Sequence, residues 1–77
     1  MTTLSPYADT DAGVARECER LFQNGGPRVY VVTNTRYIPC YASGKQALRF
    51  IAAKGDPVYQ RRKFGNSYRF VKIGEGT

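Results

Sequence analysis

The stretch that decides the fold is residues 58–73, VYQRRKFGNSYRFVKI, in which Gly65 and Asn66 separate two runs rich in aromatic and aliphatic residues. A two-residue turn of this composition between such runs is a strong signal for a β-hairpin. The turn also sets the register, because residues at equal distances on either side of it lie opposite each other. The predicted pairs are Phe64 with Ser67, Lys63 with Tyr68, Arg62 with Arg69, Arg61 with Phe70, and Tyr59 with Lys72.

Alternation of side chains along a strand gives this hairpin two chemically different faces. The first face interleaves aromatic residues with cations: Tyr59, Arg61, Lys63, Tyr68, Phe70 and Lys72. The second face has aliphatic residues at the open end of the hairpin, which favours it as the core face there: Val58, Gln60, Arg62, Phe64, Arg69, Val71 and Ile73. Arg62 and Arg69 face each other on this second side, which costs stability unless an anion lies between them.

The mixture of rings and cations predicts a nucleic-acid surface on the hairpin. Bases of a single strand stack on aromatic rings, while Lys and Arg follow the phosphates. Residues 61–63, RRK, place cations on both faces near the tip, a shape that can enter a groove as a β-ribbon. The structural alternative is that the rings pack against a helix while the cations extend outward or form cation–π pairs. A basic run can also protect an exposed strand from aggregation.

Upstream of the hairpin, apolar residues recur at helical spacing and predict a first helix over about 11–23. Its apolar stripe consists of Val14, Cys18, Leu21 and Phe22. Oxygen-bearing side chains at 9–11 are suited to cap its start, and Gly25-Gly26-Pro27 ends it.

Two strands and a second helix are expected between this helix and the hairpin. Residues 29–33, VYVVT, and 37–42, YIPCYA, have strand composition, and Pro39 indicates that the second of these strands lies at a sheet edge. Ser43 and Gln46 match a capping box, so a helix over about 44–54 follows. Lys45 lies in its first turn, where free amides attract anions, and Arg49 adds a second cation, so both are candidate phosphate contacts.

These elements predict one small α+β domain with the order α-β-β-α-β-β. An antiparallel sheet of about four strands with two helices packed on one face is the simplest arrangement that buries both helical stripes. Residues 1–8 are expected to be a flexible lead-in, and 9–77 a single basic domain.

Charge is concentrated in the second part of this domain. The chain has a net charge of +6, and residues 28–77 hold ten of its twelve Lys and Arg but only two of its six Asp and Glu. This excess of positive charge in residues 28–77 favours an anionic partner.

Catalysis and metal binding have little support in the sequence. The chain has no His, and four of its six acids lie in or near the first helix, so neither a metal site nor a pair of convergent carboxylates is expected. Cys18 and Cys40 are not close in sequence and have no evident base, which predicts buried free thiols. We expect no enzymatic activity, no cofactor and no small-molecule substrate. The absence of a long apolar segment or a leader-like start predicts a cytoplasmic protein that does not enter a membrane.

The resulting hypothesis is a non-catalytic module that binds DNA or RNA. Its expected contact residues are Tyr59, Arg61, Arg62, Lys63, Tyr68, Arg69, Phe70, Lys72, Lys45 and Arg49. The alternative is a small inhibitor or accessory protein that binds an acidic protein or nucleoprotein surface. Phages use compact proteins of this kind against host polymerases or defence machinery, as anti-CRISPR proteins do. A subunit of a ribonucleoprotein particle is a third possibility, although the capped helices and the hairpin favour autonomous folding.

Overall fold

The structure is a computed structural model that describes residues 11–77. The predicted lead-in and the first two capping residues lie outside this range. The elements follow the predicted order: α1 (Asp11–Gln23), β1 (Val29–Val32), β2 (Tyr37–Cys40), α2 (Gly44–Gln46) continued by a π-helical turn η1 (Ala47–Ile51), β3 (Pro57–Phe64) and β4 (Ser67–Glu75).

The strands form one antiparallel sheet with the spatial order β2-β1-β3-β4. The predicted register of the final hairpin is confirmed from Phe64↔Ser67 through Tyr59↔Lys72, after which the pairing shifts between Val58 and Tyr59. Pro39 lies in β2, at the edge of the sheet, as predicted. Its missing amide hydrogen is thus at a position where the sheet has a partner strand on one side only.

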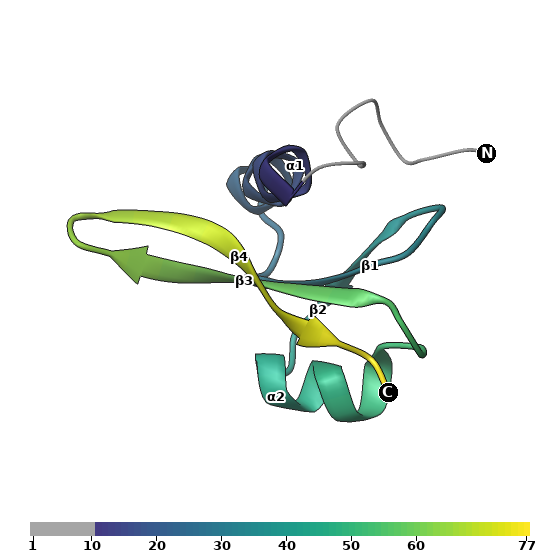
Figure 1. The fold of residues 1–77 in the computed structure, drawn as a ribbon. Helices are drawn as coiled ribbons and strands as arrows, with labels where there is room; N and C mark the ends of the chain where they lie inside the picture. Colours follow the sequence, from purple (N-terminus) through teal and green to yellow (C-terminus); the bar gives the residue numbers. More distant parts are fainter. Residues whose placement is uncertain (1–10) are drawn as a thin grey trace.

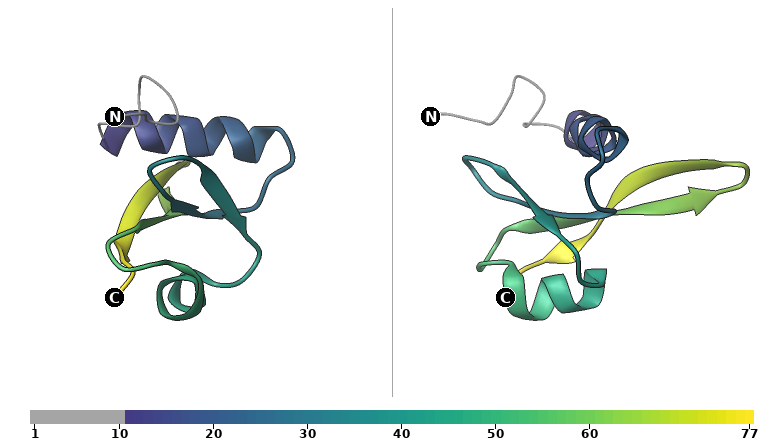
Figure 2. Two further views of the ribbon diagram at one scale, coloured as in Figure 1. Left: turned by 90° about the vertical axis from the view of Figure 1, so that its right-hand side faces the viewer. Right: turned by 180° about the vertical axis from the view of Figure 1, so that it is seen from behind.

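The two helices cover opposite faces of the sheet (Figures 1 and 2), so the prediction that both pack on one face is wrong. On one face, Val14 and Cys18 of α1 pack with Tyr30 and Val32. On the other, Ala47 packs with Val29, Val31 and Val58.

The reason for this two-sided arrangement lies in β1. All four residues of this strand are buried, and alternate side chains of a strand point to opposite faces. A strand that is apolar on both sides requires cover on both sides, as the strands of α/β proteins do.

The second helix begins at the predicted capping box. Gln46 N donates to Ser43 Oγ at 3.2 Å, and Ser43 N donates to Gln46 Oε1 at 3.4 Å. The helical segment ends at Ile51, three residues earlier than predicted, with a π-type hydrogen bond from Ala52 N to Ala47 O at 2.8 Å. None of the helices described between residues 11 and 77 is long and apolar enough to cross a membrane.

Candidate functional site

The outer part of the β3–β4 hairpin extends beyond both helices (Figure 1). We call residues 62–69 the arm, and every one of them is exposed. Its two strands are paired up to the turn at Gly65 and Asn66. Gly65 has a φ of 63°, a conformation that glycine adopts without steric cost, which suits the tight turn. The arm is therefore an ordered ribbon that presents both of its faces to solvent.

Two of the predicted contact residues lie below the arm in the core. Tyr59 and Phe70 are each only 2% exposed and pack in the cluster beneath α1. The Phe70 ring is tilted against Tyr30 and meets Phe22 edge to face. The structure therefore does not bring Tyr59 and Phe70 to an open surface. For these two residues, the alternative that the rings pack against a helix is confirmed.

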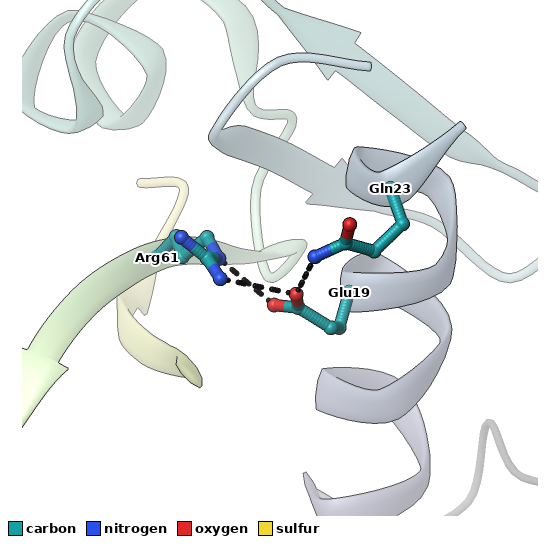
Figure 3. Close-up of polar contacts among 3 residues, drawn as sticks. All are labelled: Glu19, Gln23 and Arg61. Carbon is teal, nitrogen blue, oxygen red and sulfur yellow. Dashed lines mark hydrogen bonds and ion pairs between the residues drawn. The ribbon is translucent and has the colours of Figure 1, made fainter. Parts of the chain in front are cut away.

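Arg61 connects the base of the arm to α1 (Figure 3). Its Nε donates to Glu19 Oε1 at 2.9 Å, and its second guanidinium nitrogen, NH2, donates to Oε2 at 3.1 Å. Gln23 donates to the same carboxylate at 2.6 Å. The hydrogen bonds from Arg61 are the main reason that the pKa of Glu19 lies below its ordinary value. Arg61 is thus a neutralised, partly buried residue that orients the arm.

The exposed rings of the arm are covered by guanidinium groups. Arg69 Cζ lies 4.2 Å from the centre of the Phe64 ring, and Arg61 Cζ lies 4.7 Å from the centre of the Tyr68 ring. These are cation–π distances. The rings are 40% exposed in Phe64 and 52% exposed in Tyr68, so they contribute to the surface together with their arginines.

Three cations of the arm form no ion pair with any carboxylate of residues 11–77. Within the described part of the chain, no carboxylate forms an ion pair with Arg62, Lys63 or Arg69. By contrast, Lys72 outside the arm pairs with Glu75 at 2.6 Å. Arg62 and Arg69 are directly opposite, as predicted, and Arg62 donates one hydrogen bond to Gln60 at 3.3 Å. The arm therefore concentrates positive charge that the described fold leaves without a carboxylate.

The two sides of the sheet differ in charge. The α1 side includes Glu17 and Glu19 of that helix, which pair with Arg20 and Arg61 respectively. The α2 side includes Arg62 and Arg69 of the arm together with exposed Lys45 and Arg49, and the segment 44–51 contains no acid. Among residues 11–77, the arginines of the arm that have no carboxylate partner thus lie on the α2 side, while Lys63 is the corresponding cation on the α1 side.

Gly44 brings the start of α2 close to the base of the arm. A Cβ atom added at this position would lie 2.5 Å from Ile73 Cδ1 and 2.9 Å from Gln60 Oε1, so only glycine fits without displacement. Close packing and the capping box together explain Ser43 and Gly44 without a ligand. What remains for function is Lys45, an exposed cation that follows Gly44 at the base of the arm.

The sequence analysis did not predict a hollow that lies between the C-terminal end of α1 and the edge strand β2. It has a volume of about 280 Å³ and is lined by the end of α1, the loop that follows it and the edge strand, including Leu21, Gly26, Tyr30, Tyr37 and Tyr41. The Tyr30 hydroxyl is buried there, and no described residue accepts a hydrogen bond from it. Neighbouring Tyr41 is 82% exposed. These segments are distant in sequence and meet only in the tertiary structure, so no local sequence pattern predicts the hollow.

The residues predicted from the sequence thus fall into separate environments. Tyr59 and Phe70 are in the core, and Arg61 and Lys72 are paired with acids. Arg62, Lys63, Tyr68 and Arg69 are on the arm, with Lys45 and Arg49 exposed on the helical segment of one side. In comparisons with known proteins, no family model, no curated protein and no solved structure matches this chain.

Proposed function

We propose that this protein is a non-catalytic nucleic-acid-binding module whose contact surface is the arm. One observation carries the proposal: Arg62, Lys63 and Arg69 gather on a projecting ribbon with no carboxylate partner among residues 11–77. Nucleic-acid backbones supply regularly spaced phosphates, and cations that neutralise them release condensed counterions. The net charge of +6 attracts such a polyanion over a longer range.

The arrangement of Arg62 and Arg69 supports the same partner. Like charges directly opposite each other in an antiparallel pair destabilise the strands, so this pair costs the free protein stability. A phosphate or another anion between the two guanidinium groups removes that cost. Relief of the repulsion between Arg62 and Arg69 therefore adds to the free energy of binding an anion.

The arm is also held in a fixed orientation before it binds. Arg61 joins it to α1 through Glu19, and the strands of the arm continue into a sheet covered on both faces. A prearranged contact surface loses little conformational entropy on association. This favours an arm that binds as a rigid element.

The test is a titration of the nuclease-treated protein against labelled DNA and RNA, each single-stranded and double-stranded, at several salt concentrations. We expect affinity to fall steeply with salt. Arg62→Gln/Arg69→Gln should reduce the slope of log K against log salt by about 1.8 on B-form DNA and about 1.4 on single strands, because each neutralised phosphate contributes about 0.9 and about 0.7 respectively.

The matched control is Arg36→Gln/Lys54→Gln, which lowers the net charge equally. Arg36 follows the end of β1 and Lys54 precedes β3, so both lie at the end of the sheet away from the arm. We expect this variant to keep most of the salt slope. An equal loss in both variants, or no binding at any salt concentration, would contradict the proposal. Arg61→Glu is unsuitable here because it also breaks the contact with Glu19.

A protein partner is the second candidate, with this chain as an inhibitor or accessory factor. It is favoured by aromatic residues away from the arm, namely Tyr41 at 82% and Phe50 at 74% exposure. Large exposed rings are typical of the residues that dominate protein interfaces. Recovery of one stoichiometric protein after nuclease treatment, lost in Tyr41→Ser or Phe50→Ser but retained in Arg62→Gln/Arg69→Gln, would favour this function over the first.

A further inference from the structure

We infer that the nucleic acid is duplex DNA, and that the arm binds it in the major groove with the side that carries Arg62 and Arg69. The inference rests on the proposed function and specifies its ligand. Three features lead to it: the state of the aromatic rings, the dimensions of the arm and the distribution of charge over its two sides.

The aromatic rings of the hairpin are poorly placed to hold a single strand. Sequence-independent binding of single strands depends on bases that stack on open ring faces. Tyr59 and Phe70 are buried, while Arg69 covers a face of Phe64 and Arg61 covers a face of Tyr68. A base stacked on the covered face of either ring would have to displace a guanidinium, and Arg61 is additionally held by Glu19. One face of each ring is therefore already occupied, so the arm is a poor stacking platform and its cations are the expected contacts.

The arm has the dimensions of a groove-binding ribbon. The major groove of B-form DNA admits a two-stranded β-ribbon and is about 8.5 Å deep. The paired rows of the arm run from Arg62↔Arg69 to Phe64↔Ser67, with the turn at Gly65 and Asn66 beyond them. At about 3.4 Å for each step along a strand, these rows span about 7 Å, and the turn brings the length of the arm close to that depth. The major groove of A-form RNA is too narrow for side chains to reach the bases, so this mode of binding favours a DNA duplex over an RNA duplex.

The charge distribution selects the side of the ribbon. Arg62 and Arg69 lie opposite each other on the α2 side, where Lys45 and Arg49 follow and the segment 44–51 has no acid. On the α1 side the arm offers only Lys63, because the neighbouring Arg61 is already paired with Glu19. Guanidinium groups donate two hydrogen bonds to O6 and N7 of guanine from a rigid planar fork, whereas the ammonium group of Lys reaches the same atoms from a flexible stem. We therefore place Arg62 and Arg69 in the groove, where their planar donors reach base edges and their charge lies between the two phosphate backbones. Lys45 is placed toward the adjacent phosphates.

The first experiment compares a 20-base-pair DNA duplex containing G·C pairs with its separated strands and with an RNA duplex of the same sequence. We expect the DNA duplex to bind at least tenfold more tightly than either. Methylation of guanine N7, in the major groove, should interfere with binding, whereas methylation of adenine N3, in the minor groove, should not. Equal or tighter binding of the single strands or the RNA, or interference from adenine N3 alone, would overturn the inference while leaving the proposed function intact.

The second experiment uses Arg62→Lys/Arg69→Lys, which keeps the charge and removes the planar donors. We expect its salt slope to match that of the original protein, and its preference for G·C-containing over A·T-only duplexes to fall at least fivefold. A weaker preference for G·C-containing duplexes together with weaker guanine N7 interference in this variant would support the inference, and an unchanged preference with unchanged interference would overturn it. If the original protein binds no nucleic acid, the proposed function itself fails. Circular dichroism of each variant checks that the sheet is retained.

Discussion

Arg61 of β3 and Glu19 of α1, 42 positions apart in sequence, form two parallel hydrogen bonds of 2.9 and 3.1 Å (Figure 3). The Arg61 guanidinium also lies 4.3 Å from the centre of the Phe22 ring. One side chain therefore joins the base of the arm to both a carboxylate and a ring of the helix above it. The orientation of the arm depends on this contact.

The contact predicts a pH-dependent effect of Glu19→Gln. In the folded protein the pKa of Glu19 is lowered, chiefly by the hydrogen bonds from Arg61, so the carboxylate stabilises the fold above its ordinary pKa of about 4.3. That contribution is lost as the pH falls through the lowered folded-state value. Urea denaturation should show Glu19→Gln to be less stable than the original protein at pH 7, with the difference shrinking on acidification below pH 4.

A double-mutant cycle with Arg61→Gln assigns this effect to the pair. We expect the coupling between the two positions to decline over the same acidic range. A stability difference between Glu19→Gln and the original protein that does not change with pH would contradict this interpretation.

Arg62→Thr should weaken nucleic-acid binding and raise the free energy of unfolding of the free protein. Removing one of two cations that lie directly opposite relieves repulsion, and threonine suits an exposed strand. We expect the free energy of unfolding to rise by a few tenths of a kcal/mol, on the order of the cross-strand pair energies, at low salt, and the gain to fade as salt screens the charges. Lys63→Thr, opposite Tyr68, is the control and should show no such salt-dependent gain. Equal behaviour of the two variants would show that the Arg62–Arg69 pair carries no repulsion.

Tyr30→Phe should leave the fold as stable as before or make it more stable. Tyr30 is 2% exposed, and its hydroxyl has no acceptor among the described residues. Removing a buried polar atom that lacks a partner relieves a desolvation cost, so we expect the free energy of unfolding to rise by up to about 1 kcal/mol. Tyr41→Phe, at an exposed ring, is the control and should change stability by less than about 0.5 kcal/mol. A loss above about 1 kcal/mol in Tyr30→Phe would indicate that the hydroxyl is bonded in solution, for example to water in the adjoining hollow.

Cys18 should react with thiol reagents only when the protein unfolds. It is fully buried, and burial raises the pKa of its thiol to about 12, so hardly any thiolate is present at pH 8. Reaction with a disulfide reagent at pH 8, followed by peptide mapping, should show Cys18 unmodified in the folded protein and fully modified in guanidinium chloride. Rapid modification under native conditions would reveal local opening between α1 and the sheet.

Local chemistry accounts for the parts of the fold that the sequence predicts well. The turn at Gly65 and Asn66 determines the register of β3 and β4, because pairing propagates from the turn one residue at a time. Ser43 and Gln46 satisfy each other's backbone groups within one turn, so the start of α2 is also visible in sequence. Pro39 identifies the edge strand by the hydrogen bond it is unable to donate.

The prediction that both helices cover one face of the sheet was wrong, although a sequence feature that indicates cover on both faces was present. Residues Val29 to Val32 are consecutively apolar, a pattern of strands covered on both faces. A helical stripe shows only that a helix has a buried side, and it does not show which face of the sheet that side contacts. The choice depends on contacts between segments distant in sequence, such as Cys18 with Tyr30 and Ala47 with Val31.

The sequence by itself determined the helices, the hairpin, its register and the concentration of cations near its tip, because each depends on neighbours within a few residues or on one tight turn. Only the tertiary structure decided which of those cations are available. It buries Tyr59 and Phe70 under α1 and neutralises Arg61 with Glu19, and it leaves Arg62 and Arg69 exposed beyond the helices. The physical reason is that the burial and pairing of a side chain depend on elements that reach it from elsewhere in the chain, and their approach is set by the packing of the whole domain.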